Sequence, residues 1–293
     1  MNTFSISDLQ DYSGIKAHTI RIWEQRYNAL QPNRSEGNTR YYDGNQLRRL
    51  LNIVSLMDSK YKISDLCTMT DESLYILIEA KFQSNGKNEN GNEYFISQLI
   101  AAATNFDEPY FEKIFANCVI RLGLRNTYKD IIYPLLNRMG LIWASGNRFA
   151  AYEHFSSNLI MQKLYAAIDA LPPNDSANSS TWVLFLPENE YHEIGLLFSY
   201  YILRLAGKKV IYLGSNLPLD ALIGAAEKIK PNHLLIFLVH NNTPENSQTY
   251  LNELKKSFGK SKIHISGNIH LIEKLKLGKE IFWEQSIEDL EKQ

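Results

Sequence analysis

The sequence lacks the features that would place this protein in a membrane, outside the cell or on a polyanion by bulk charge. It has two cysteines, Cys67 and Cys118, whose spacing suits neither a metal site nor a disulfide framework. No apolar run approaches the roughly 18 residues that span a bilayer, and the first residues lack the basic and apolar segments of a secretory signal. We therefore expect a cytoplasmic protein with no membrane partner. The formal net charge is −1, so any nucleic-acid site has to come from a local patch.

The composition and the breaks in the chain predict a globular protein of several domains. Hydrophobic residues make up 44% of the 293 residues and charged residues 22%, which excludes wholesale disorder. A stretch at 84–93 has no apolar residue and is rich in Asn and Gly, as flexible linkers are. From residue 181 onward, four strand-like apolar runs alternate with helical patterns, which predicts an α/β domain with a parallel sheet. We expect domains at 1–72, 95–174 and 180–293, with a short helix and linker at 73–94.

The first fifty residues carry the pattern of two short helices, a turn-rich hairpin and a third helix. Ser7 is the expected N-cap of the first helix, and Ser13-Gly14 is the expected turn before a second helix over 17–27. On that second helix, Ile20 and Trp23 share one face, which favours a core position for Trp23. Residues 32–42 suit a β-wing because a turn core is flanked by arginines. The pattern predicts a winged helix-turn-helix.

Charge supports a nucleic-acid role for this segment. Between residues 12 and 49 there are seven basic and three acidic side chains, a net charge of +4 in a chain that is nearly neutral overall. Contacts between basic side chains and phosphates supply salt-dependent affinity. The alternative is a small helical module with a solvated charged face.

The sequence motifs of this segment resemble those of the winged-helix domain of the MerR family of transcription regulators. The match runs in order through HTIRIWEQRY, LQPNR, GNTRYY and LRRL. The resemblance implies that double-stranded promoter DNA is the partner and that the recognition helix enters the major groove. The implied DNA-binding residues are Lys16, His18, Thr19 and Arg21 on the helix, Arg26 and Tyr27 at its end, and Arg34, Arg40 and Tyr41 in the wing. MerR-type proteins are dimers. Because Ser73–Phe82 offers only one modest helix, we expect a homodimer or homotetramer that depends on the later domains.

Two further clusters of polar residues follow. Trp143 is separated by nine residues from Glu153-His154, and the loop after the first strand of the α/β domain carries Glu190, His192 and Gly195. The end of such a strand is the ligand position in an open α/β sheet. The alternative interpretation needs no ligand: Trp143 belongs to the core, Glu153-His154 is the polar start of a helix, and His192 caps its helix or faces solvent.

The pattern Glu190-x-His192-x-x-Gly195 resembles the D/E-x-H-x-x-G signature of cobalamin-binding domains. That resemblance implies that His192 is the lower axial ligand of cobalt and that Glu190 orients its ring. The pattern Trp143-x9-Glu153-His154 resembles the helical cap of light-responsive, adenosylcobalamin-binding MerR-type repressors. It implies a central four-helix bundle, a Rossmann-like cobalamin-binding sheet, adenosylcobalamin as the cofactor, and these three residues above the ligand.

Three positions depart from the family pattern. The second binding loop has no Ser, and its matching position falls at about Leu238; the third loop, with Gly-Gly in the family, reads Ser266-Gly267. These loops surround the nucleotide tail, so we expect weaker tail binding. Ala144 stands where the photoreceptors have a second histidine, so no stable bis-His state after illumination is expected.

The sequence therefore predicts a DNA-binding regulator, most simply a repressor, that senses cobalamin. The alternative is the same regulator with a degenerate effector domain that takes another ligand or serves only oligomerisation. Corrinoid enzymes form a third class, but a substrate barrel alone needs about 250 residues, so we expect no enzyme.

Overall fold

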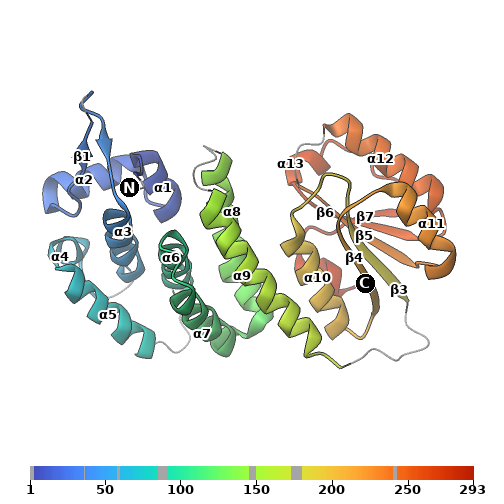
Figure 1. Cartoon of the computed structure of the whole chain (residues 1–293), viewed down its shortest axis with the longest axis horizontal. Coiled ribbons are helices and arrows are strands. Elements are labelled where there is room, and N and C mark those ends of the chain that lie inside the picture. Colours follow the sequence, from blue (N-terminus) through green and yellow to red (C-terminus); the bar gives the residue numbers. More distant parts are fainter. Residues whose placement is uncertain are drawn as a thin grey trace. The chain divides into compact units, whose positions relative to one another are not determined.

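The computed structural model describes residues 3–35, 37–57, 60–84, 91–144, 150–172, 180–239 and 243–293. The chain divides into two compact units, Met1–Leu159 and Ile160–Gln293 (Figure 1). The division falls within helix α9 (Ala150–Asp169). Among the helices of the described residues, none is long and apolar enough to cross a membrane.

The first unit opens with the expected winged helix-turn-helix. Helices α1 (Ile6–Ser13) and α2 (Ala17–Tyr27) are joined at Gly14, whose φ of 71° is the left-handed conformation that ends α1. Strands β1 (Asn33–Arg34) and β2 (Arg40–Tyr41) pair antiparallel as the wing, and α3 (Gly44–Leu56) follows. Trp23 is 6% exposed and belongs to the core, as predicted.

The expected N-cap of α1 is wrong. Ser5, not Ser7, caps the helix: its hydroxyl accepts a hydrogen bond from the Asp8 N–H, and the Asp8 carboxylate accepts one from the Ser5 N–H at 2.7 Å. This reciprocal pair needs a side-chain acceptor three positions after the cap, and Asp8 supplies it. Ser7 already lies inside the first turn.

The rest of the first unit is helical. Its elements are α4 (Ile63–Thr68), α5 (Asp71–Ser84), α6 (Gly91–Thr104), α7 (Glu108–Thr127), the π-helical turn η1 (Tyr128–Ile132), α8 (Tyr133–Ala144) and the first half of α9. The predicted stripe of Ile131, Leu135 and Met139 is buried; the side chain of Ile142, its fourth member, lies outside the described set. Pro134 has no N–H to bond the preceding turn, which agrees with the widened π turn before it.

Helices α3 and α6 share one buried core with a polar network inside it. The Gln98 amide of α6 donates to Ser55 Oγ at 2.9 Å and to Asn52 Oδ1 at 3.3 Å, both on α3. Tyr110 of α7 donates to Gln98 Oε1 at 2.8 Å. A fully bonded buried network fixes one arrangement of the helices that carry it. The winged helix-turn-helix is therefore docked on the central helices rather than separated from them.

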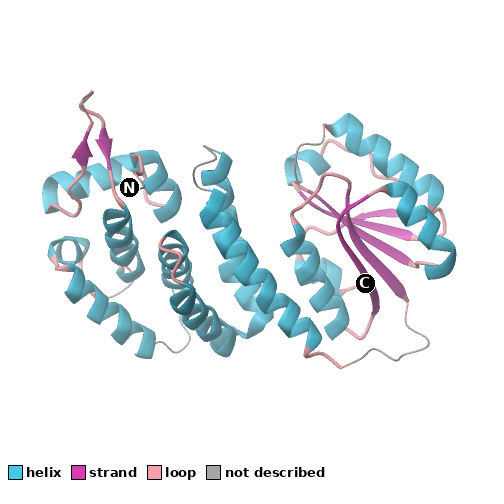
Figure 2. Cartoon of the chain, viewed as in Figure 1, coloured by secondary structure: helices cyan, strands magenta, loops and turns pink. Residues whose placement is uncertain are grey.

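The second unit is a five-stranded parallel sheet with helices on both faces (Figure 2). The strands, in the order β4-β3-β5-β6-β7, are β4 (Lys209–Leu217), β3 (Thr181–Pro187), β5 (His233–Leu238), β6 (Lys262–Gly267) and β7 (Ile281–Trp283). The helices are the second half of α9, α10 (Glu193–Leu205), α11 (Leu219–Ile229), α12 (Pro244–Ser257), α13 (Ile269–Ile272) and α14 (Ile287–Glu291). The chain runs from β3 outward to β4 and then returns to β5 on the other side of β3. That reversal makes the carboxyl end of β3 the switch point at which such sheets bind ligands.

One face of this sheet carries an unexpected row of rings. Trp182 of β3 stacks on His233 of β5 with centroids 4.2 Å apart. His233 Nδ1 lies 2.9 Å from His264 Nε2, and His264 Nδ1 lies 2.7 Å from Glu284 Oε1. The Glu284 carboxylate accepts a hydrogen bond from His264 Nδ1, so His264 Nε2 is the acceptor for a hydrogen bond that His233 donates from its Nδ1. The row is a buried chain of hydrogen bonds.

The row predicts a dependence of stability on pH. Burial, with the nearby His264, Lys262 and Lys208, lowers the pKa of His233 to about 4. Between pH 4 and 6.5 the unfolded chain binds more protons at this residue, so the free energy of unfolding is full above about pH 6.5 and falls by about 1–3 kcal/mol as the pH drops toward 4. Urea unfolding at pH 7.5, 6.0 and 4.5 measures this. His233→Asn keeps a donor but cannot titrate; an equally steep fall in that variant contradicts the assignment.

Candidate functional site

The predicted DNA-contacting side chains lie on the surface of the winged helix. Lys16, the N-cap residue of α2, and His18 and Arg21 on α2 are exposed, while Thr19 is half-buried. At the other end of α2, Arg26 is exposed and Tyr27 is half-buried. The recognition helix thus presents its polar side outward while Ile20 and Trp23 hold its other side in the core.

The wing places two arginines directly opposite one another. Arg34 and Arg40 are cross-strand partners, next to the Asn33 and Tyr41 pair. Like charges in that position repel, so the pair favours an anion that bridges or flanks it. Glu24 of α2 lies 3.5 Å from Arg40 Nε, which ties the wing to the recognition helix. Arg34, by contrast, is exposed and donates a hydrogen bond within the wing, to Asn38 Oδ1 at 2.6 Å.

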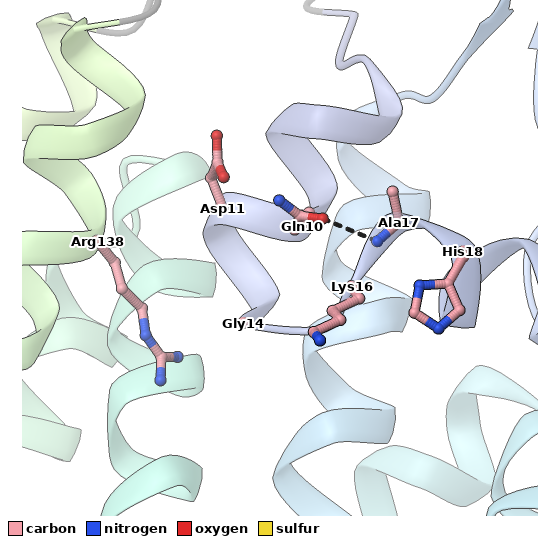
Figure 3. A pocket seen from close by; sticks show the side chains of 7 residues that line it. All are labelled: Gln10, Asp11, Gly14, Lys16, Ala17, His18 and Arg138. Carbon is pink, nitrogen blue, oxygen red and sulfur yellow. Dashed lines mark hydrogen bonds between the residues drawn. The ribbon is translucent and has the colours of Figure 1, made fainter.

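A pocket of about 530 Å³ separates the helix-turn-helix turn from α8 (Figure 3). Its lining residues are Gln10, Asp11, Gly14, Lys16, Ala17, His18 and Arg138. Arg138 donates to both oxygens of Glu93, at 2.7 and 2.6 Å, and its guanidinium lies against Gly14. Two of the predicted DNA contacts therefore lie beside the helix that carries Trp143.

In the second unit, Glu190 and His192 are brought together at the end of β3. Glu190 is 2% exposed, and its Oε1 lies 2.5 Å from His192 Nδ1. The same oxygen accepts from the N–H groups of Tyr191 and His192, and Oε2 accepts from the N–H of Val239 at 3.0 Å. These backbone N–H donors fix the orientation of the Glu190 carboxyl group, which turns Oε1 toward His192. His192 then carries its proton on Nδ1, and Nε2 is the ring nitrogen that suits a metal.

This donor set fits an axial imidazole for a corrin. His192 stands at the N-cap position of α10, yet its side chain makes no capping hydrogen bond, and 40% of it is exposed. A corrin supplies four nitrogens to its cobalt, so a single protein imidazole would suffice as the ligand from this chain. Within the described ranges, no group of three His, Cys, Asp or Glu side chains forms a metal site of its own.

The predicted upper-face residues lie in the first unit. Glu153 and His154 are adjacent on α9, where Ser157 donates to Glu153 Oε1, and His154 is 72% exposed. Trp143 lies in α8, but its side chain and that of Ala144 are outside the described set. The roles of Trp143, Glu153 and His154 in covering the upper side of a cofactor therefore remain predictions.

Sequence reasoning missed Phe237, the residue of the second loop that faces Gly195. A Cβ built on Gly195 lies 2.8 Å from Phe237 Cε1 and 3.2 Å from Cδ1. Leu238, the position named for the second binding loop, is 1% exposed and belongs to the core on the other face of the sheet. Strand alternation was the available signal, because His233, Leu235 and Phe237 share a face.

The packing of the sheet explains both residues of the third loop, Ser266 and Gly267. Gly267 has φ 125°, and a Cβ there lies 2.3 Å from the carbonyl oxygen of Leu238. Only glycine allows this approach of β6 to β5. Ser266 donates its hydroxyl to the backbone oxygen of Glu284 at 2.8 Å. Both residues are explained without a ligand.

Comparison with known proteins assigns the first two regions. Residues 4–72 match the family described as MerR HTH family regulatory protein, and residues 93–168 match the B12 binding domain. The HTH-type transcriptional repressor CarH of Myxococcus xanthus is 25% identical over 258 residues, which are 87% of this chain and 85% of CarH. The repressor CarA of the same organism is 26% identical over 266 residues, 90% of this chain and 86% of CarA. The monomethylamine corrinoid protein of Methanosarcina barkeri is 14% identical with a TM-score of 0.48, over 69% of this chain and 97% of that one, which is too low to establish a common fold.

Proposed function

Because this chain joins a MerR-type helix-turn-helix domain to a B12-binding domain and is homologous to the repressors CarH and CarA, we propose that it is a DNA-binding transcription regulator that senses cobalamin. The observation that best supports cobalamin sensing is the hydrogen bond between the buried Glu190 carboxylate and His192 Nδ1. We propose a repressor rather than an enzyme, acting in the cytoplasm. The DNA-binding domain is proposed at residues 1–72, the cap at 95–174 and the cobalamin domain at 180–293.

In the proposed complex, His192 would hold the cobalt of the cofactor through Nε2, and Glu190 would keep the ring in the tautomer that this requires. Adenosylcobalamin is the proposed form, with Trp143, Glu153 and His154 on its upper side. Gly195, Ser266 and Gly267 complete the proposed cofactor-binding set, of which only Gly195 lies next to His192 on the first turn of α10. Illumination is proposed to end without a stable second histidine ligand, because Ala144 follows Trp143.

An absorption spectrum tests the sensing half. The protein is mixed with adenosylcobalamin in the dark, desalted and scanned. Retained corrin colour is expected. The second candidate, a regulator whose effector domain takes another ligand or serves only oligomerisation, is favoured by Phe237 against Gly195. A protein that stays colourless with adenosylcobalamin and also with aquocobinamide, a corrinoid without the nucleotide tail, selects it.

The DNA-binding half predicts that Arg21→Ala and Arg40→Ala each weaken binding to the operator. Loss of a base contact costs about 1–3 kcal/mol at one base pair, and loss of a phosphate contact lowers the salt slope by about one. Gel shifts at two salt concentrations distinguish the two. Lys228→Ala, an exposed lysine of the second unit, is the control. Wild-type affinity in both arginine variants would count against the assigned DNA surface.

The chain is proposed to act as a homodimer or homotetramer. The described apolar side chains of α5 do not offer a long coiled-coil seam, because Leu74 and Ile78 are already buried. Light scattering of the full chain, with and without adenosylcobalamin, is expected to give a species larger than the 33.8 kDa monomer. A monomer under both conditions contradicts this.

A further inference from the structure

The first turn of α10 is closed on the side that faces β5. Gly195 stands three residues after His192 and has no side chain, which leaves a gap between α10 and the sheet. The Phe237 ring fills that gap, since Cε1, Cδ1 and Cζ lie 2.8, 3.2 and 3.4 Å from where a Cβ of Gly195 would be. Contacts under 3 Å leave no room for a second group between the two residues.

The other side of the same turn is also occupied. Glu193 Oε1 accepts from Tyr212 at 2.7 Å, and its Oε2 accepts from Ser215 at 3.3 Å. A Cβ on Gly214 of β4 would lie 3.4 Å from Glu193 Oε1. The carboxylate and the tyrosine thus fill the space between α10 and β4. His192 is held at the surface above a turn that is packed on both sides.

The shape of cobalamin makes this packing a matter of selectivity. Its nucleotide tail is attached to the same face of the corrin as the lower axial ligand. When a protein imidazole takes that axial position, the displaced tail has to descend beside the imidazole. Here the path along His192 leads onto the first turn of α10, where Phe237 stands on one side and Glu193 on the other.

We propose that Phe237 is a specificity-determining residue that favours corrinoids without a nucleotide tail over complete cobalamin. The proposal rests on the proposed function, because it assumes that His192 ligates cobalt. It names the ligand class of that site: a corrin ring with a free lower face, which meets His192 without having to move the Phe237 ring. The benzene ring of Phe237 is half-buried, so removing it opens space next to Gly195 without emptying the core on the other face of the sheet.

Binding of two coloured ligands to the full chain tests the proposal. Aquocobinamide, which lacks the tail, and hydroxocobalamin are titrated against wild type, and absorption spectra report coordination by imidazole. Wild type is expected to bind cobinamide about tenfold or more tightly than cobalamin. Phe237→Ser is expected to reverse or remove that preference by strengthening cobalamin binding, with cobinamide affinity unchanged. Phe282→Ser, which removes a half-buried ring from the edge strand β7, is the control and should keep the wild-type preference.

A ligand-free measurement checks the contact itself. Gly195→Ala should lower the melting temperature in wild type, because its methyl group meets the Phe237 ring, and should be tolerated in the Phe237→Ser background. Equal affinity for both ligands, unchanged by Phe237→Ser, overturns the specificity proposal alone. Failure of the wild type to bind either ligand overturns the cobalamin-sensing function together with it. A melting temperature that Gly195→Ala lowers equally in both backgrounds overturns the contact.

Discussion

Alanine at position 192 is expected to remove imidazole coordination of cobalt and to weaken corrinoid binding by about 100-fold or more. Loss of a residue that merely orients a metal ligand costs about 10–100-fold, so loss of the ligand itself should lie at or beyond that range. The spectrum of the His192→Ala complex should resemble that of a corrinoid with water below the metal. Absorption titrations with aquocobinamide and hydroxocobalamin measure both effects.

His270→Ala is the matched control, because His270 is an exposed histidine of the same unit. Glu190→Gln gives an intermediate test. A glutamine has one acceptor oxygen, and Glu190 uses two, one toward His192 and one toward Val239. We expect this variant to bind less tightly than wild type but to keep the imidazole spectrum. Unchanged spectrum and affinity in His192→Ala would remove the proposed ligand.

Leucine at position 264 is expected to destabilise the second unit by about 3–5 kcal/mol, the cost of breaking a buried pair by removing one partner. His264 is fully buried, and Glu284, 2.7 Å from its Nδ1, is 5% exposed. The substitution leaves the Glu284 carboxyl without that partner in a site that water barely reaches. Urea unfolding at pH 7.5 measures the loss.

The double variant His264→Leu/Glu284→Leu separates the pair from the packing. Replacing both partners by apolar groups removes the unsatisfied carboxyl, so the double variant should recover most of the stability that the single variant loses. A double variant as unstable as the sum of the two single ones would show that the residues act independently.

The elements with a strong local period were predictable from the sequence. The helix-turn-helix and wing follow from the spacing of Ile20 and Trp23 and from the turn residues around Gly37. Four of the five strands follow from their apolar runs. Strand β7 was missed because three residues, Ile281–Trp283, are too few to show a period. Ser5 was missed as a cap because Ser7, with Gln10 three residues after it, also fits the sequence pattern of a capping box.

The site was predictable as far as local spacing reaches. Glu190 and His192 are two residues apart, so their contact follows from the sequence pattern. The packing of Phe237 against Gly195 was not predicted; the position singled out in the second loop was its neighbour Leu238, which lies on the other face of the sheet. In a strand, a shift of one residue moves a side chain to the opposite face. Contacts between distant segments, such as Gln98 with Ser55 or His264 with Glu284, leave no trace in a single sequence.

The buried seam between α3 and α6 limits where this protein can be cut and recombined. A graft of the winged helix alone onto another sensor would leave Asn52 and Ser55 on a bare face, together with the apolar side chains beside them. Such a module should be sticky and poorly soluble. A junction placed after α7 keeps Gln98 and Tyr110 with their partners. Engineers who exchange sensor domains in this protein should therefore transfer the winged helix-turn-helix together with α6 and α7 as one part.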